Sequence, residues 1–401
     1  MNIFVINSGS SSIKYQLFKM PGENPVCSGL VERIGLEDTV VTHKVFLNEE
    51  EKVTVKKIYL ADHEAGLHEV SALLTDKIIG VIHDPEEINA VGHRVVHGGE
   101  SFKATTIITA EVKKKIKELF PLAPLHNPAN YLGIEVAEKI FLKAKQVAVF
   151  DTAFHQTMPE KAFRYALPQS FYTDLHIRAY GFHGTSHKYV SEQAMAFLQN
   201  EQARIITIHL GNGCSMAAVH AGRSVDTSMG FGPVSGLVMG TRSGDIDASV
   251  IFHLIEQQGY SPQQVSELLN KKSGMQGLTG LSDMRDIRAA IEAGNKDAVL
   301  ALDLYAYRIK KYIGAYAAVL NGLDAIVFTA GVGENAKDVR EKICSDMQYL
   351  GLKFDAALNE NLRGNLREIN CADSPVKILV IATNEELEIV KQCYSLLNAS
   401  N

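Results

Sequence analysis

Short apolar runs that end in polar, glycine-rich turns form the most informative pattern of this chain. Residues 205–208 form an apolar run that ends at the turn 211–213, and a second run extends from Ser215 to His220. The runs 3–6 and 13–18 repeat this order around another polar turn. Short apolar runs between turn residues are typical of buried strands. The pattern therefore predicts a strand, turn, strand unit that occurs twice, roughly 200 residues apart.

The central turn has the composition of a phosphate-binding loop. Glycines on both sides of Asn212 allow a tight turn with positive φ and leave bare N–H groups for a ligand. The unit leads from strand to strand, unlike the strand, turn and helix of a Rossmann or Walker site. A single glycine-rich hairpin is more often only a hairpin, but the second copy favours a ligand-binding role. We expect two similar domains that each contribute a phosphate-gripping turn to a shared cleft.

Other periodic segments extend each unit into an α/β domain. Residues 40–47 and 52–60 alternate between apolar and polar positions, as antiparallel strands do. Short apolar runs predict further buried strands, and longer stretches carry the helical period of 3.6 residues. The predicted buried strands are 89–96, 146–150, 324–328 and 376–382; the predicted helices include 62–80, 129–143, 188–199, 248–258, 261–272 and 296–320, with a loop at 277–285.

Composition and length narrow the class of protein. The 401 residues are too many for one core, and about 150 residues per domain gives two or three domains. A net charge of −6 argues against a nucleic-acid surface. The N-terminal residues lack the features of a signal peptide, and no apolar segment approaches ~20 residues, so we expect a cytoplasmic protein without a membrane partner. The five cysteines contain no CxxC pair, which favours buried thiols over disulfides or zinc.

Charged residues at the ends of buried strands are the first candidates for chemistry. Arg94 ends one such strand, where an arginine needs an anionic partner or an exit to water. Asp151 follows another, at the strand end where open α/β sheets bind ligands, although a capping aspartate has the same position. His183 lies at a glycine turn, either as a polar group facing a cleft or as a structural histidine. Its spacing from His187 suits a metal on a helix, but Gly184 interrupts the register and no third ligand is near.

Two helix starts complete the candidate set. The glycine turn 331–335 precedes a helix whose N–H groups can bind an anion. Glu385 and Glu386 begin the last helix, where acids suit the helix dipole and only one is needed for a functional role. The chain contains no Walker, GxGxxG, GxSxG or HExxH motif.

Ten segments, taken in order, resemble the signature segments of the acetate kinase family. They are NSGSSSIK, GHRVVHGG, PLAPLHNP, VFDTAFHQTMP, YGFHGTSH, HLGNGCS, DTSMGFGP, MGTRSGD, TAGVGEN and ATNEELEI. Together they are highly specific and cover nearly the whole chain. The resemblance implies the acetate and sugar kinase, heat-shock and actin superfamily fold, with two duplicated α/β domains and a nucleotide cleft between them. We expect residues 1–150 and 151–401 as the domains, with the last helix, 384–398, packing back on the first.

The resemblance also implies an activity. An ATP:acetate phosphotransferase moves the ATP γ-phosphoryl group to acetate in a reversible, direct in-line reaction that gives acetyl phosphate and ADP. Mg²⁺ would be the cofactor, with Mn²⁺ as a possible substitute, and the enzyme would be a cytoplasmic homodimer. The apolar helix 296–320 suits either a subunit contact or an internal core position. A different acyl or sugar kinase, separated by the acceptor that stimulates ADP release, and an actin-like binding protein with acetate-independent ATP turnover stay open.

Residue roles follow from the resemblance by position. Asp151, Arg94, Arg242 and His183 would be catalytic: the arginines flank the transferring phosphoryl group, the histidine hydrogen-bonds it, and the aspartate lies near acetate. Asn7 and Glu385 would bind the metal. The acyl-methyl pocket would be lined by Val96, Leu125, Phe182 and Pro233, with Arg94 beside the substrate. The nucleotide would be held by Ser12, Lys14, His209, Leu210, Gly211, Asn212, Gly213, Asp283, Met284, Arg285, Gly331, Val332, Gly333, Glu334 and Asn335.

One departure and one chemical argument bear on the acceptor. Residues 232–235 are Gly-Pro-Val-Ser where the family often has Thr-Pro-Leu-Glu, so the acyl chain-length preference is open. A carboxylate acceptor has a pKa near ~4–5 and is already ionised, so no base has to remove a proton. Cations should then outnumber bases, because phosphoryl transfer depends on positioning and charge neutralisation. In a sugar kinase, Asp151 could instead deprotonate a hydroxyl.

Overall fold

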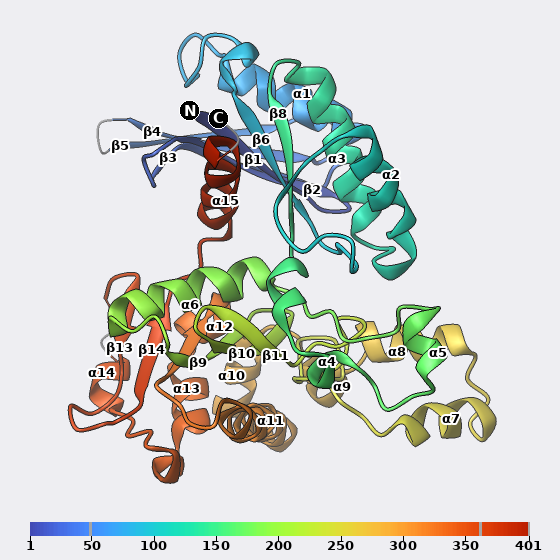
Figure 1. Cartoon of the computed structure of the whole chain (residues 1–401), viewed down its shortest axis with the longest axis vertical. Coiled ribbons are helices and arrows are strands. Elements are labelled where there is room, and N and C mark those ends of the chain that lie inside the picture. Colours follow the sequence, from blue (N-terminus) through green and yellow to red (C-terminus); the bar gives the residue numbers. More distant parts are fainter. Residues whose placement is uncertain (48–49, 361–362, 400–401) are drawn as a thin grey trace. The chain divides into compact units, whose positions relative to one another are not determined.

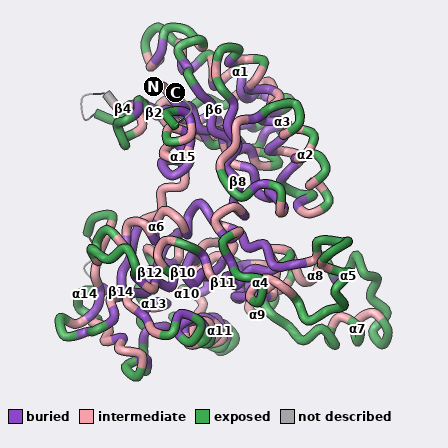
Figure 2. Tube along the Cα trace, viewed as in Figure 1, coloured by how far each residue is buried: buried purple, intermediate pink, exposed green. Residues whose placement is uncertain are grey.

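The computed structural model describes residues 1–47, 50–360 and 363–399, which divide into two compact units (Figure 1). The first unit contains Met1–Phe154 together with the C-terminal segment that begins at Asn384. The second contains His155–Thr383. Each unit is built on one mixed β-sheet, and the central strands of both sheets are buried (Figure 2).

The sheet of the first unit contains three adjacent parallel strands. β1, β6 and β8 are parallel neighbours, while β2, β3, β4, β5 and β7 are antiparallel to the strands beside them. The strand order is β5-β4-β3-β2-β1-β6-β8-β7. The bounds are β1 Asn2–Ser8, β2 Ser12–Lys19, β3 Pro25–Glu32, β4 Val40–Leu47, β5 Glu50–Lys57, β6 Ala90–Val95, β7 Thr106–Ile107 and β8 Lys145–Phe150.

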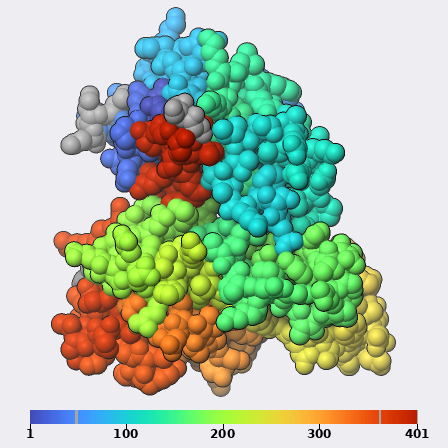
Figure 3. Space-filling model, viewed as in Figure 1, coloured from blue at the N-terminus to red at the C-terminus, as the bar shows by residue number. Residues whose placement is uncertain are grey.

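Helices cover both faces of this sheet. Phe4 and Ile6 point into a core with α1 (His63–Leu74) and α3 (Asn127–Ile140), whose neighbour is α2 (Ala110–Glu118). The alternate positions face α15 (Glu385–Ala399), which packs on β1, β6 and β8. A Cβ at Gly92 of β6 would lie 2.9 Å from the Cys393 sulfur of α15, so glycine permits this close approach. In Figure 3, α15 (red) lies against the dark-blue strands of the unit.

The second sheet repeats the topology of the first. Its order is β11-β10-β9-β12-β14-β13, in which β9, β12 and β14 are parallel and the flanking strands are antiparallel. The order and directions match β3-β2-β1-β6-β8-β7 of the first unit, which confirms the predicted duplication and two-domain α/β class. The bounds are β9 Arg204–Leu210, β10 Cys214–His220, β11 Arg223–Thr227, β12 Ala325–Thr329, β13 Leu366–Glu368 and β14 Lys377–Ile381.

Side chains alternate between the two faces of β9 and β10. Thr207 and Ser215 face α6 (Gly184–Leu198), whereas Cys214 faces α11 (Lys296–Leu320), whose Tyr305 hydroxyl lies 3.2 Å from the Cys214 sulfur. The other helices of the unit are α4 Glu160–Phe163, α5 Gln169–Thr173, α7 Ala248–Glu256, α8 Pro262–Lys271, α9 Gly274–Thr279, α10 Met284–Glu292, α12 Ala330–Asn335, α13 Lys337–Cys344 and α14 Ala356–Glu360. Among the described residues, none of the helices has the length and apolar character needed to cross a bilayer.

Some local predictions were wrong. The helix predicted for 62–80 ends at Leu74, because the chain then turns through Asp76 and Gly80. The loop predicted for 277–285 overlaps α9, and β11 was not anticipated. Four cysteines are buried as expected, but Cys371 is partly exposed.

Candidate functional site

The parallel strands of the first unit bring three predicted residues together. Asn7 is at the end of β1, Arg94 is near the end of β6, and Asp151 directly follows β8. Their neighbours Ile6, Val95 and Phe150 point into the core on the α1–α3 side. Alternation therefore turns the three polar side chains to the α15 face, at the carboxyl ends of adjacent strands.

Arg94 is the centre of this cluster. Its Nε lies 3.1 and 3.0 Å from the two carboxylate oxygens of Asp151, and its Nη2 lies 2.5 Å from Oδ2. Nη1 donates to Oδ1 of Asn7 at 3.4 Å. Burial opposes the charge, but Asp151 and then Glu385 raise the pKa of Arg94. The guanidinium thus remains a cation in a site where only 1% of the Asp151 side chain is exposed.

The first turn of α15 adds two acids to the same cluster. An oxygen of Glu385 lies 3.8 Å from Nε of Arg94, and the carboxylate of Glu386 lies 2.6 Å from Nζ of Lys14. Burial raises the pKa of Glu385 to about 7, which Arg94 opposes and Asp151 reinforces. The sequence analysis gave a role to Glu385 alone and left Glu386 to the helix dipole, because an acid in a first helical turn normally needs no further explanation.

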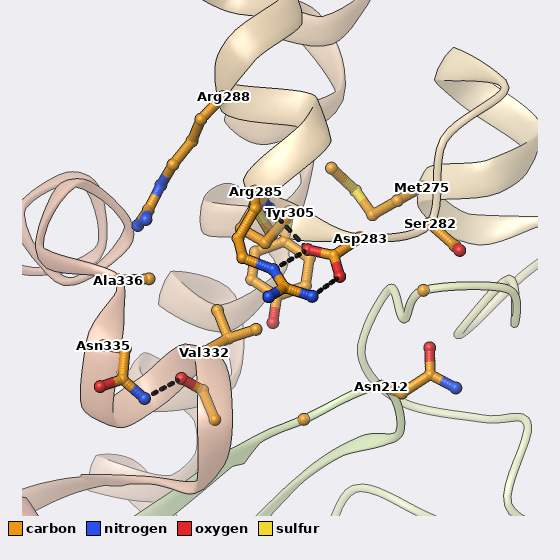
Figure 4. A pocket seen from close by; sticks show the side chains of 14 residues that line it. Asn212, Met275, Ser282, Asp283, Arg285, Arg288, Tyr305, Val332, Asn335 and Ala336 are labelled. Atoms are coloured by element: carbon orange, nitrogen blue, oxygen red, sulfur yellow. Dashed lines mark hydrogen bonds and ion pairs between the residues drawn. The ribbon is translucent and has the colours of Figure 1, made fainter.

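A cavity of about 590 Å³ lies within the second unit (Figure 4). It contains many of the residues predicted to bind the nucleotide, on the 211–213 turn, the start of α10 and α12. The predicted residues that line it are Gly211, Asn212, Asp283, Met284, Arg285, Gly331, Val332 and Asn335. Sequence reasoning missed Gly240, Met275, Ser282, Arg288, Tyr305 and Ala336, which also line it.

Polar groups at the cavity already have partners that fix their positions. Asp283 caps α10 and binds Arg285, with 2.6 Å between Oδ2 and Nη2 (Figure 4). The Asn335 amide donates to the Gly331 carbonyl at 2.8 Å. Glu334, also predicted to bind the nucleotide, accepts backbone hydrogen bonds from residues 330 and 383. It lies in α12, a short helix where a glycine turn was predicted, and ties this helix to the segment that follows β14.

A second group of predicted residues meets at Gly213. The His183 ring and Nη1 of Arg242 come within 3.4 and 3.5 Å of the point that a Cβ on Gly213 would occupy. His183 stacks on His209, with 4.3 Å between ring centroids. Neither Gly211 nor Gly213 has a φ in the left-handed region, so that expectation was wrong. Instead His183 has a φ of 56°, in the left-handed region that non-glycine residues adopt uncommonly.

Arg242 differs from Arg94 in its partners. Its Nη1 donates to the Pro233 carbonyl at 3.2 Å, and no described carboxylate forms an ion pair with it. Burial lowers its pKa from the ordinary value. A purely structural role would pair Arg242 with Asp245 or Asp247, which are close in sequence. Neither ion pair is present, because Asp245 accepts a hydrogen bond from Tyr312 and Asp247 caps α7. A cation whose described partners are the Pro233 carbonyl and the Met239 sulfur, both uncharged, is available to an anionic ligand.

The residues predicted to line the acyl pocket divide between the units. Val96 is buried in the first unit, whereas the Leu125 side chain is 68% exposed there. Phe182 is buried in the second unit, and Pro233 is partly exposed. Their common role stays a prediction.

The chain is similar to known proteins over nearly its whole length. Residues 2–391 match the model of the acetokinase family. The chain belongs to the acetokinase family. An acetate kinase of Flavobacterium johnsoniae is 58% identical over 397 residues, which are 99% of this chain and 100% of that protein.

Solved structures of this family have the same fold. The crystal structure of Porphyromonas gingivalis acetate kinase is 47% identical, with a TM-score of 0.92 over 99% of each chain. A propionate kinase from Francisella tularensis is 42% identical, with a TM-score of 0.89 over 98% of each chain. Membership of the acetokinase family makes this protein a kinase of the phosphotransferase class, which decides against an actin-like binding protein.

Glu385→Gln tests the charge balance of the first cluster. Because burial raises the pKa of Glu385 from 4.5 to about 7, the folded state binds this proton more tightly than the unfolded state. The resulting stabilisation is present below pH 4.5 and lost as the pH rises through 7, a change of about 3 kcal/mol at most. Without added metal, the variant should melt above the parent at pH 8 and no higher at pH 4.

Calorimetry of both proteins in EDTA measures this difference. Glu64→Gln is the matched control, since Glu64 forms an exposed ion pair with Lys139 in the same unit. The control should leave the melting temperature unchanged at both pH values. A Glu385→Gln protein that melts below the parent at pH 8 would contradict the burial argument.

Proposed function

We propose that this protein transfers the γ-phosphoryl group of ATP to acetate, reversibly and in line, to give acetyl phosphate and ADP. Membership of the acetokinase family and the acetate kinases among its relatives support the substrate pair. The observation that carries the proposal is the Arg94–Asp151 pair, in which Arg94 engages both carboxylate oxygens.

This pair distinguishes a carboxylate acceptor from a hydroxyl acceptor. A sugar kinase needs an aspartate that is free to take a proton from a hydroxyl. Both oxygens of Asp151 accept hydrogen bonds from a guanidinium instead, so this carboxylate supports a cation. Acetate needs no such base, because it is ionised at neutral pH. The cluster therefore suits a nucleophile that arrives already charged.

Phosphoryl transfer would rest on positioning and charge neutralisation. We assign Arg242, Arg94 and His183 to the phosphoryl oxygens, because charge spreads over those oxygens in the transition state. The cavity around Tyr305 suits the nucleoside, and the backbone N–H groups of residues 212 and 213 suit its phosphates, since the N–H of Gly211 donates to the Gly213 carbonyl.

The donor set of the first cluster fits Mg²⁺, with Mn²⁺ as a substitute. Asn7 and Glu385 offer hard oxygen ligands. Among the described residues, no group of three acidic, histidine or cysteine side chains is placed to hold a metal, so the protein would supply only these few ligands. Mg²⁺ commonly takes one or two carboxylates and completes its shell with water and substrate phosphates. Asn7 and Glu385 would hold the ion, which would neutralise phosphate charge when bound.

A homodimer and a cytoplasmic location belong to the same proposal. α11 is partly core, since ten of its side chains are buried, but Leu300 and Tyr307 are 62% and 64% exposed. Exposed apolar side chains on one helix suit a subunit contact. All five cysteines are free, as suits a reducing compartment. Light scattering at micromolar concentration should give the mass of a dimer, and a monomeric mass would rule it out.

Substitution of the two arginines should separate catalysis from stability. Arg242→Ala should lower kcat by about 10²–10³ and leave the nucleotide KM within several-fold, because the lost interaction is strongest in the transition state. Arg242→Lys should restore only part, since lysine lacks the planar two-pronged donor. Arg94→Ala should lower both kcat and the melting temperature, because it leaves Asp151 buried without its counter-charge.

Kinetics and calorimetry on the same preparations measure both effects. Arg164→Ala is the control, because Arg164 forms an ion pair with the exposed Glu160. It should change neither quantity. A stable Arg242→Ala protein with the turnover of the parent would remove Arg242 from the site.

The acceptor range tests the substrate assignment. We expect acetate to be preferred, propionate tolerated and butyrate poor, because one methylene in a small pocket is worth about 1–3 kcal/mol. The similarity to a propionate kinase supports this graded order. ADP release should be measured with formate, acetate, propionate, butyrate and glycerol. Equal catalytic efficiency for acetate and butyrate, or stimulation by glycerol, would contradict the assignment.

A further inference from the structure

A chain of buried hydrogen bonds runs behind His183. Its Nδ1 lies 2.9 Å from Oγ of Ser215, and the same hydroxyl lies 2.7 Å from Nε2 of His187. Nδ1 of His187 lies 2.7 Å from Oγ1 of Thr207. Thr207, His187 and Ser215, here called the relay, are each 0% exposed. The fold creates the relay because Thr207 and Ser215 share the face of β9 and β10 that α6 covers.

One hydroxyl proton couples the two histidine rings. A serine hydroxyl has one hydrogen, so between two neutral rings it donates to one and accepts from the other. Burial, reinforced by His155 and His209, lowers the pKa of His187 well below 6.5, so this ring is neutral at neutral pH. The protonated nitrogen of His183 therefore depends on that of His187.

Thr207 gives the chain a direction. Its alternative acceptor, the Ala217 carbonyl, is 3.4 Å away, whereas Nδ1 of His187 is at 2.7 Å. The shorter contact is the better one for an O–H donor. If Thr207 donates to His187, the His187 proton is on Nε2 and donates to Ser215. Ser215 then donates to Nδ1 of His183, whose proton stays on Nε2.

The surroundings of His183 favour a neutral ring. The Arg242 cation and the His183 ring both lie beside Gly213, and His209 stacks on the His183 ring with 4.3 Å between centroids. His155 packs behind His187, with 5.6 Å between centroids. A positive neighbour disfavours a second positive charge. A histidine here needs another way to present an N–H group.

We propose that Thr207, His187 and Ser215 are positioning residues that hold His183 neutral, with its proton on Nε2. His183 then donates a hydrogen bond to a phosphoryl oxygen without having to take up a proton from solvent. The relay extends the proposed function and rests on the assignment of His183 to the phosphoryl group.

Nitrogen NMR of the full chain with ¹⁵N-labelled histidine tests the relay directly. At pH 7.5 the rings of His183 and His187 should both show a protonated Nε2 and an unprotonated Nδ1. A proton on Nδ1 of His183 would overturn the proposal. This measurement needs no turnover, so it fails independently of the phosphoryl assignment, which an unchanged kcat in His183→Ala would remove.

Kinetics test the consequence. Ser215→Ala and Thr207→Val should each lower kcat by about tenfold and leave the nucleotide KM within about twofold. A loss of this size is typical when a hydrogen-bond partner that orients a functional histidine is removed. The deficit should shrink as the pH falls far enough to protonate His183, because the imidazolium ion carries a proton on both nitrogens whatever the state of the relay.

Two matched variants serve as controls. Ser224→Ala removes a buried serine bonded to Nδ1 of His155, and Thr227→Val removes a hydroxyl bonded to the Met216 carbonyl; both lie outside the relay. These controls should keep the kcat and pH profile of the parent. Equal losses in the controls, or an unchanged pH profile in the relay variants, would overturn the proposal.

Discussion

The ion pair between Arg94 and Asp151 is the constraint on which the first unit's site depends. A buried carboxylate is costly unless a cation compensates it, and Arg94 supplies that charge with hydrogen bonds to both oxygens. Once the pair forms, both oxygens of Asp151 are engaged by Arg94, and Arg94 is fixed at the strand ends. Glu385 then lies next to a site that is already nearly neutral, which helps to explain why burial prevails over Arg94 in raising its pKa.

Much of the fold was predictable because short apolar runs and polar turns are local signals. The runs at 3–6 and 205–208 became the central strands β1 and β9, and Arg94 and Asp151 were found from their places at strand ends. The boundaries of α11 were also predicted, since its apolar pattern continues without interruption over 25 residues. In each case the relevant physics lies within a few neighbouring residues.

The missed features depend on contacts between distant segments. Tyr305 looks like one more apolar position of a helix, and its place at the cavity follows only from the packing of α11 against β10. Glu386 gains its role from Lys14, which is far away in sequence. The glycines of the 211–213 turn were interpreted as a need for positive φ, whereas it is His183, beside this turn, that has a positive φ. Composition alone does not distinguish a glycine that turns from one that makes room.

The duplicated topology gives the two units the same strand ends but opposite chemistry. In the first, the cluster around Arg94 and Lys14 contains three carboxylates against two cations, which suits a metal ion and a support for one arginine. The second unit contains Arg242, in the segment between β11 and α7, without a described carboxylate partner, together with histidines that hydrogen bonds can hold neutral. Because the two sheets share one topology, different side chains beyond their strands are enough to give two copies of one fold opposite local charge.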